Sequence, residues 1–478
     1  MTQPSFIKNI ALRVVLTIPL RFRGLIVLPL LTRLYPQDIY GAWLQVLLIS
    51  EVLSNFLSLQ LGAALVRYLS GEKEHKRTIK AAFTATLVSS LCFILVVWVF
   101  SDGASRLIFG SSNLQSILLF ASYWILIRAS MRIGLSVLRS QERIGTLSAR
   151  ELLSALWMIC AVFISYLIGL ELKRLILICL AGDAVLLIWI LFQIGVPFPL
   201  LSLHKSVAEV KKFIPFSTPL IFGSLFLWFT RSIDRFLIVQ LLGLASVGIY
   251  GVTFQVASLL FFVLGPINFV LFPRTSSAWN QGDKDDVNRY FSQAITLTLI
   301  LSLPLIVGIV MTSDGLIRLL AGESYVSGKA LIFWLLLSCL ASMVYQNHLY
   351  VIQLVEKTYL LPILFICTTM LNFILGYFLI SKIGLLGAAI SRVLTLILMA
   401  MVVTMWARHY VRFQINWNLV LRVGLSSLLM GLAINWIPMD SWSKLLMKIF
   451  AGGFIFILFL FLLRVASKEN LMMLKNQF

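Results

Sequence analysis

Arginines lie deep inside long apolar stretches of this sequence, where charge is costly. Arg128 and Arg132 are four residues apart, so on a helix their side chains form one stripe. Arg231 and Arg235 repeat that spacing, with Asp234 between them. Guanidinium groups stay charged when buried and bind phosphate through paired hydrogen bonds. These arginines therefore predict a site for a negatively charged ligand, such as a phosphate or pyrophosphate.

A third pair of arginines, Arg21 and Arg23, lies in the first apolar stretch. Residues two apart point to nearly opposite sides of a regular helix, so either Pro19 distorts this helix or only one arginine faces the site. Arg21 is the favoured one, because it corresponds to Arg231 in an internal repeat of the chain. Each deep arginine costs about 2.5–3.5 kcal/mol at a bilayer centre. We therefore expect these side chains to face a wet cavity or to be paired.

Three carboxylates are assigned to the same apolar stretches: Glu51, Asp183 and Asp234. Asp234 is expected to neutralise Arg231, three residues away. Glu51 and Asp183 either carry coupling protons or sodium ions, or pair with the arginines, and the sequence leaves both readings open. No cofactor and no metal site are predicted, because the four histidines and five cysteines are scattered without ligand spacing.

The composition fixes the class of protein in which these charges lie. Of 478 residues, 60% are hydrophobic and only 12% are charged, and the mean hydropathy is +0.97. Such a chain cannot cover soluble domains with polar surface, which excludes a soluble enzyme, a disordered protein and a nucleic-acid-binding protein. The formal net charge of +20 must therefore be interpreted by its position along a membrane.

Membrane-spanning helices need about 20 mostly apolar residues. The sequence predicts fourteen of them, at 10–34, 40–67, 81–100, 114–138, 147–169, 174–196, 213–240, 246–272, 291–312, 329–353, 358–380, 384–407, 418–437 and 444–465. Four prolines are expected to mark ends of spans: Pro36, Pro197, Pro273 and Pro438. The 39 basic residues concentrate in the N-terminus, the C-terminal tail and alternate loops, which places both termini in the cytoplasm.

The sequence also contains a duplication. Ile39-Tyr40-Gly41 matches Ile249-Tyr250-Gly251, and Arg106-Leu107 matches Arg318-Leu319 at nearly the same offset. Spans 1–6 thus correspond to spans 7–12 as a parallel repeat, and transporters built this way bind substrate between their halves near the midplane.

The predicted fold class is an all-α integral membrane protein with two six-helix lobes around a central cavity. Its predicted parts are an N-terminal lobe (1–196), a cytoplasmic linker containing a short surface helix (197–212), a C-terminal lobe (213–410), and two further helices with a cytoplasmic tail (411–478).

Several segments resemble bacterial polysaccharide flippases of the multidrug/oligosaccharidyl-lipid/polysaccharide exporter superfamily. The resemblance covers roughly residues 10–465. The segments that carry it are Leu28 to Pro36 with Tyr40-Gly41, Ser232 to Leu237 with Gly248-Ile249-Tyr250, Phe272-Pro273-Arg274 with Gly282-Asp283-Lys284, and Gly322 to Tyr325.

The resemblance implies a function. It implies alternating access that carries an undecaprenyl-pyrophosphate-linked oligosaccharide from the cytoplasmic to the periplasmic leaflet of the bacterial inner membrane. The product would be O-antigen or a related surface polysaccharide, such as that of lipopolysaccharide. The expected partners are this lipid-linked sugar, the bilayer, and a polysaccharide polymerase with its chain-length machinery.

Three alternatives stay open at this point. One is a lipid II flippase of the same superfamily, which would need the same cationic site. The second is a drug or cation antiporter, but its cavity would need acidic residues, whereas the deep charges here are mainly basic. The third is a membrane enzyme such as a polysaccharide polymerase. The external loops predicted at 101–113 and 313–328 are short and lack the paired carboxylates for acid/base chemistry.

Overall fold

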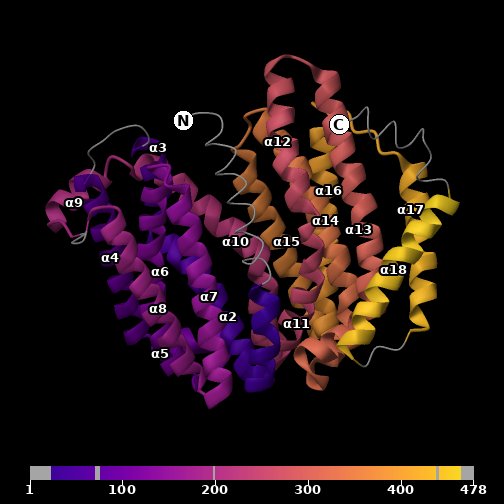
Figure 1. Cartoon of the computed structure of the whole chain (residues 1–478). Coiled ribbons are helices and arrows are strands. Elements are labelled where there is room, and N and C mark those ends of the chain that lie inside the picture. The colour runs from indigo at the N-terminus through magenta and orange to yellow at the C-terminus, as the bar shows by residue number, and fades with distance from the viewer. Residues whose placement is uncertain (1–22, 70–75, 197–199, 438–440, 464–478) are drawn as a thin grey trace. The chain divides into compact units, whose positions relative to one another are not determined.

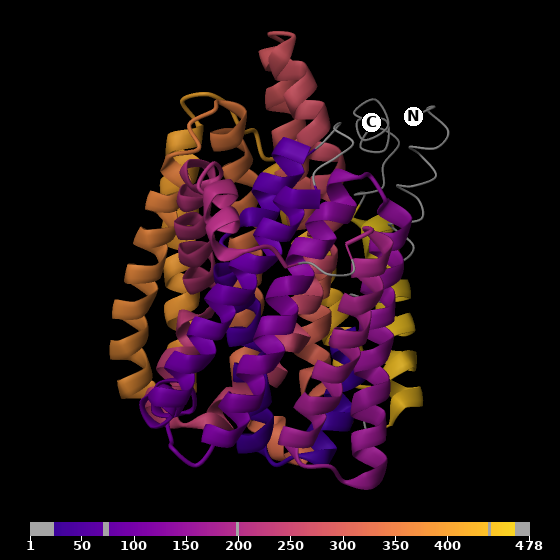
Figure 2. The ribbon, with the colours of Figure 1, turned by 90° about the vertical axis from the view of Figure 1, so that its left-hand side faces the viewer.

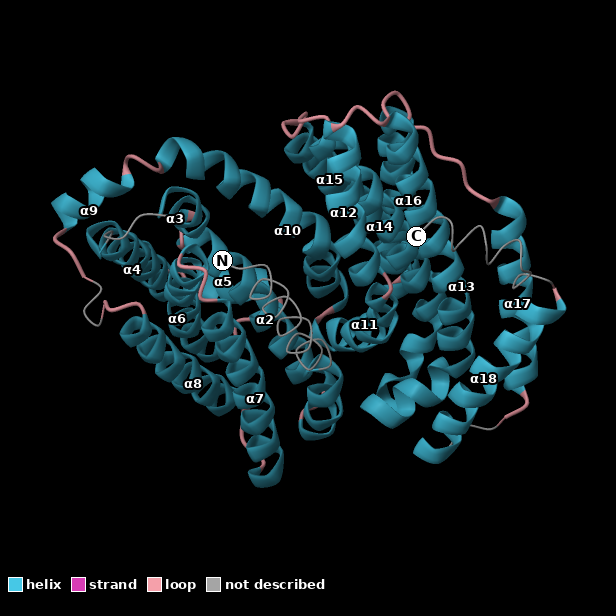
Figure 3. Cartoon of the chain, turned by 45° about the horizontal axis from the view of Figure 1, so that its top comes forward, coloured by secondary structure: helices cyan, strands magenta, loops and turns pink. Residues whose placement is uncertain are grey.

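The computed structural model describes residues 23–69, 76–196, 200–437 and 441–463. These residues form helices joined by turns and short loops, and none of them lies in a strand (Figure 3). The prediction of an all-helical membrane protein is thereby confirmed.

The chain forms two compact units, Met1–Gly248 and Ile249–Phe478. In the first unit, residues 23–34 are helical, and the helices that follow are α2 (Gln37–Leu57), α3 (Leu61–Leu69), α4 (Lys76–Val99), α5 (Ser101–Phe109), α6 (Gln115–Ser140), α7 (Ile144–Ile168), α8 (Leu172–Gln193), α9 (Leu203–Val210) and α10 (Ile214–Leu242) (Figure 1). α11 (Leu244–Ala257) begins in the first unit and continues into the second.

The second unit consists of the remaining helices, each labelled in chain order. They are η1 (Ser258–Phe262), α12 (Leu264–Asn280), α13 (Lys284–Ala321), η2 (Glu323–Gly328), α14 (Lys329–Leu354), α15 (Leu360–Ile383), α16 (Leu385–Ala407), α17 (Trp417–Asn435) and α18 (Trp442–Leu462). α16 packs against α14 and α15, while α17 and α18 pack on each other and on α13.

The number of helices fit to span a membrane is close to the prediction. Among the described residues twelve helices are long and apolar enough, or thirteen if the bent pair α9–α10 is counted as one span. The predicted first span, 10–34, lies largely outside the described residues, so the count of fourteen stays a prediction.

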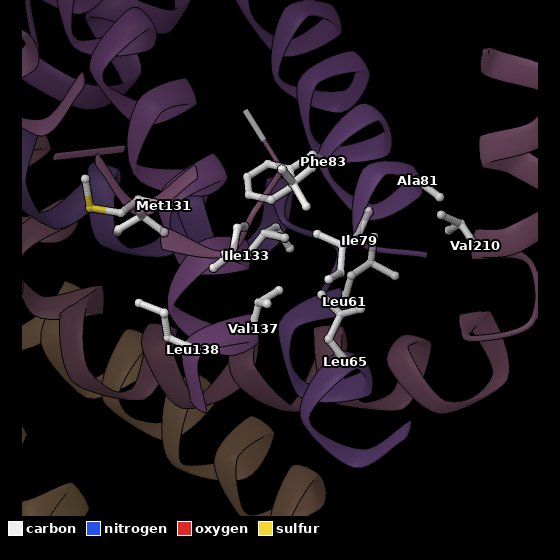
Figure 4. Packing of buried hydrophobic residues seen from close by; sticks show 14 residues of the cluster. Leu61, Leu65, Ile79, Ala81, Phe83, Met131, Ile133, Val137, Leu138 and Val210 are labelled. Carbon is white, nitrogen blue, oxygen red and sulfur yellow. The ribbon is translucent and has the colours of Figure 1, made fainter. Parts of the chain in front are cut away.

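α6 is the central helix of the first unit. It packs against α2, α3, α4 and α8. Figure 2 shows the helices of the first unit from the side, running roughly along one direction. One stripe of α6 carries the fully buried Ile133, Val137 and Leu138, which meet Leu61 of α3 and Ile79 of α4 in one hydrophobic cluster (Figure 4). Because this stripe is buried against α3 and α4, it fixes the rotation of α6 about its axis. The arginines of α6 lie on another part of its surface, so their direction is fixed as well.

The predicted second span, 40–67, is wrong as a single helix. α2 ends at Leu57, and Leu59 and Gln60 adopt left-handed φ values of 52° and 51° before α3 begins. Non-glycine residues pay about 1–2 kcal/mol for this conformation. Side chains from other helices support the break, because Ser89 donates to the Leu57 carbonyl at 2.6 Å and Gln60 Nε2 donates to Ser224 Oγ at 2.9 Å.

Pro273 was also predicted wrongly as the end of a span, because it lies inside α12. Proline removes a backbone N–H, but transmembrane helices tolerate it where nearby hydroxyls satisfy the backbone. The Thr275 hydroxyl donates to the Leu271 carbonyl at 2.8 Å, but the carbonyl that loses its helical donor to Pro273 is that of Phe269, four residues earlier. Pro36, in contrast, caps the start of α2 as predicted, while Pro197 and Pro438 lie outside the described residues.

Two further boundaries differ from the sequence prediction. The span predicted at 246–272 is broken into α11, η1 and α12. α13 continues through the predicted loop 313–328 as far as Ala321, so only the short η2 is left of that loop.

The surface helix predicted within 197–212 is α9, which is bent by 78° relative to α10. Its Ser206 and Val210 are buried, while Leu203 and Val207 are exposed. Arg77 of α4 binds its Glu209 at 3.0 Å, so α9 is attached to the first unit. α10 packs against α2, α3 and α5 within the same unit, and the predicted lobe boundaries at 196, 212 and 410 stay predictions.

Candidate functional site

The first unit contains a pocket that collects several of the predicted site residues. Side chains from the helix 23–34 and from α2, α6, α7 and α8 line it. They are Arg23, Leu47, Trp124, Arg128, Ser154, Trp157, Met158, Cys179 and Asp183. Two arginines from the first and fourth predicted spans therefore share one site with one carboxylate.

Arg128 is positioned by an aromatic pair. Its guanidinium carbon lies 5.1 Å from the ring centroid of Trp124, one helical turn earlier on α6. Trp124 in turn stacks on Trp43 of α2, with ring centroids 6.0 Å apart and planes inclined by 17°. A cation over an indole face is stabilised by the ring quadrupole without being neutralised. Arg128 thus keeps its charge available to a ligand.

Asp183 anchors the wall of the pocket. Its carboxylate is buried and accepts hydrogen bonds from Trp124 Nε1 at 2.8 Å and from Ser154 Oγ at 3.2 Å. Arg150 Nη2 lies 3.9 Å from the same carboxylate. These hydrogen bonds and the nearby guanidinium offset the cost of burying the carboxyl group. Because Arg150 already pairs with Asp183, this carboxylate is a poor candidate to neutralise both Arg23 and Arg128.

Arg150 is the site residue that the sequence analysis missed. It lies on α7, where its side chain is largely buried. The signal was present, because position 150 falls inside the span predicted at 147–169. The sequence does not show which way its side chain points, and the packing of α7 on α8 brings it to Asp183.

Arg132 lies one turn beyond Arg128 on α6 and contacts α2. Its Nε donates to Ser54 Oγ at 2.9 Å, and its Nη2 donates to the backbone carbonyl of Glu51 at 3.2 Å. Glu51 itself is exposed. The two arginines of the α6 stripe thus have different environments, since Arg128 lines the pocket and Arg132 joins α6 to α2.

The predicted residues of α10 lie apart from this pocket. Arg231 is exposed, Arg235 is half-buried, and Asp234 is buried with its Oδ1 accepting the Arg235 backbone N–H at 2.9 Å. Arg21, which the sequence favoured over Arg23, lies outside the described residues. Arg23 lines the pocket, so it cannot be set aside in favour of Arg21.

Within the described part of the chain, no group of three or more histidine, cysteine, aspartate or glutamate side chains could hold a metal ion. The chemistry that this pocket offers is therefore that of guanidinium, indole and a paired carboxylate. It can bind an anion and an apolar ring.

Comparison with known proteins places the chain in a family. The sequence profile of a family described as "Polysaccharide biosynthesis protein" matches residues 30–330, which is more than half of the chain. The chain belongs to this family. A relative from Haloferax volcanii, named "Probable low-salt glycan biosynthesis flippase Agl15", is 22% identical over 347 residues, covering 70% of each chain.

Solved structures show that this family member has the fold of known membrane transporters. The lipid II flippase MurJ in an inward closed conformation superposes with a TM-score of 0.77 at 15% identity, covering 94% of this chain and 98% of MurJ. An inward-facing multidrug transporter of the MATE family gives a TM-score of 0.67 at 13% identity, covering 81% and 93%. The polysaccharide-biosynthesis family is thus confirmed, and the fold is that of known membrane transporters.

Proposed function

We propose that this protein is a flippase for an oligosaccharide repeat unit linked to undecaprenyl pyrophosphate. It moves the unit from the cytoplasmic to the periplasmic leaflet of the bacterial inner membrane by alternating access. The cargo feeds the synthesis of O-antigen or a related surface polysaccharide, in which a polymerase and chain-length machinery act after the flip.

One observation carries this proposal. Arg23 and Arg128 line the same pocket, and the carboxylate of that pocket, Asp183, already pairs with Arg150. Two guanidinium groups in a low-dielectric pocket repel each other, and an anion between them relieves that repulsion. Guanidinium also matches the geometry of phosphate oxygens. A pyrophosphate group supplies the charge that this pocket lacks.

Arg132 extends the cationic surface along α6. It is held by Ser54 and Glu51, so it is placed to receive the anion one turn from Arg128. Arg21, Arg231 and Arg235 are proposed as further cationic positions along the path of the head group. The lipid tail stays in the bilayer, because transferring it through a polar cavity would cost about 0.8 kcal/mol for each CH₂ group.

Coupling to a proton or sodium gradient is proposed for the intramembrane carboxylates Glu51, Asp183 and Asp234. Glu51 is the strongest candidate, because it is exposed on α2 and its own backbone carbonyl contacts Arg132. Asp183 already accepts two hydrogen bonds and pairs with Arg150. Asp234 is buried and bound to the Arg235 backbone.

The printed name of the Haloferax relative supports a lipid-linked glycan as the cargo, since that protein is named as a glycan biosynthesis flippase. A cation antiporter is disfavoured, because the pocket is lined by two arginines and a single aspartate. An anionic cargo satisfies these charges, whereas a cationic drug would add to their repulsion.

The direct test uses the purified protein in proteoliposomes that contain undecaprenyl-pyrophosphate-linked sugar in the inner leaflet. A lectin added outside reports the sugar that reaches the outer leaflet. We expect sugar to appear with the wild-type protein and to be retained with Arg128→Gln. Equal lectin binding in protein-free liposomes, or undiminished flipping by Arg128→Gln, would contradict the proposal.

A further inference from the structure

The pocket has a second indole whose placement the cationic site does not explain. Trp157 of α7 donates its Nε1–H to the Ile178 carbonyl of α8 at 3.0 Å. The indole lies directly over Gly182, where an added Cβ would fall 1.8 Å from Nε1 and 2.2 Å from Cδ1 of that ring. Any other residue at position 182 would therefore displace Trp157.

A glycine in the middle of a helix is costly, by roughly 1 kcal/mol relative to alanine. Gly182 lies inside α8, a span of 22 residues, next to the anchoring Asp183. Gly182 therefore lowers the stability of α8 but leaves the space that the Trp157 indole occupies.

The two pocket tryptophans differ in how much of their surface is open. Trp124 is only 3% exposed, since it packs against Trp43 and Arg128. Trp157 is 41% exposed and lines the same pocket as Arg23 and Arg128. A partly exposed indole therefore borders the pocket that Arg23 and Arg128 also line.

We propose that Trp157 is a stacking platform for the first sugar ring of the cargo, and that Gly182 is the residue that positions it. This inference rests on the proposed function. In a pyrophosphate-linked glycan the first sugar is bonded directly to a phosphate, so a pocket that binds the phosphate with arginine must place that ring within a few ångströms. The C–H face of a pyranose ring is apolar, and an indole offers it a large flat surface.

Stacking of this kind reads the shape of the ring rather than its hydroxyl pattern. Trp157 has its only N–H bound to Ile178, so it has no donor left with which to read a hydroxyl group. The protein would therefore accept different pyranoses at the first position of the repeat unit. It would bind a lipid that carries no sugar less tightly than one that carries a sugar.

The test measures binding of two lipids to the full-length protein in nanodiscs. One is undecaprenyl pyrophosphate, and the other is the same lipid carrying a single N-acetylglucosamine. We expect the wild-type protein to bind the sugar-bearing lipid about three- to tenfold more tightly, the range that aromatic contacts of this size supply. Trp157→Leu should abolish this preference, so that the two lipids bind with equal affinity, and Trp157→Phe should keep most of the preference.

Gly182→Ala is the positioning variant and should resemble Trp157→Leu, because the methyl group occupies the space of the indole. Two matched controls should keep the preference. Trp98→Leu removes an exposed tryptophan of α4 that does not line the pocket, and Gly145→Ala adds a methyl group in α7 where no atom lies within 4 Å.

The outcomes separate the inference from the proposed function. If Trp157→Leu weakens the binding of both lipids equally, or of neither, Trp157 only packs α7 on α8 and the platform is rejected. In that case, a loss of affinity for both lipids in Arg128→Gln still supports the flippase. If Arg128→Gln leaves both affinities intact, the phosphate site itself is wrong, and the platform that depends on it is rejected too.

Discussion

The indole of Trp124 and the carboxylate of Asp183 are 59 residues apart in the chain, yet they form a 2.8 Å hydrogen bond between α6 and α8. This bond fixes the ring over which Arg128 lies. The carboxylate of Asp183 therefore orients Trp124 and, through it, the Arg128 guanidinium that is proposed to bind the cargo. Asp183 acts on the site through Trp124, so its replacement should affect Arg128 as well as the fold.

The arginines of α6 should be essential for export. We expect Arg128→Ala and Arg132→Ala to abolish surface polysaccharide while leaving the protein level intact, because each removes one guanidinium group from the proposed cationic surface of α6. Polymer on the cell surface and protein in the membrane are measured together. Arg139→Ala, an exposed position on the same helix, is the matched control and should export normally. Full polymer in both the Arg128 and the Arg132 variant would rule out the cationic site.

Asp183 should contribute strongly to stability. Removing one partner of a buried ion pair costs about 3–5 kcal/mol, because the other charge is left uncompensated. Asp183→Ala should therefore lower the thermal unfolding temperature of the purified protein. Asp102→Ala, which breaks an exposed pair with Arg106 at 3.0 Å, should change it little. Similar unfolding temperatures for the two variants would show that Asp183 is not paired as described.

Glu51 should make transport sensitive to an ion gradient. We expect flipping in proteoliposomes to respond to an imposed pH or sodium gradient in the wild type and to lose that response in Glu51→Gln, which cannot exchange its charge. Binding of the lipid in the absence of a gradient should persist in the variant. Transport that is flat across both gradients in the wild-type protein would remove the case for a coupling role.

The attachment of α9 should depend on pH through Glu209. A hydrogen bond from Lys212 and the charges of Lys212 and Arg77 lower the pKa of this carboxyl below its ordinary value of 4.5. A group whose pKa is lower when folded contributes stability above its unfolded pKa and loses it as the pH falls through the folded value. The wild type should thus be more stable than Glu209→Gln at pH 7, and the gap should close below pH 4. A gap that is the same at both pH values would contradict this assignment.

The sequence predicts the helical architecture of this protein better than the details of its site. Long apolar runs locate spans reliably, because a helix must satisfy its own backbone in a membrane. The break at Leu59 and Gln60 carries no glycine or proline signal, and it exists because Ser89 and Gln60 bond across helices. Pro273 lies inside α12, so a proline within an apolar run does not by itself mark the end of a span.

The candidate site shows the same division. The spacing of Arg128 and Arg132 and the depth of Asp183 could be read from the sequence. The meeting of Arg23 with Arg128, and the pairing of Arg150 with Asp183, depend on how five helices pack. Periodicity within one helix cannot supply that information, because it gives the face of a residue and not the neighbour that the face meets.

The most direct test of the central claim is lipid analysis of cells that lack this gene, combined with a probe of membrane sidedness. Our account predicts that an undecaprenyl-pyrophosphate oligosaccharide accumulates on the cytoplasmic face and that surface polymer disappears. If single repeat units instead reach the periplasmic face and remain unpolymerised, the protein acts after the flip, and the flippase assignment is wrong.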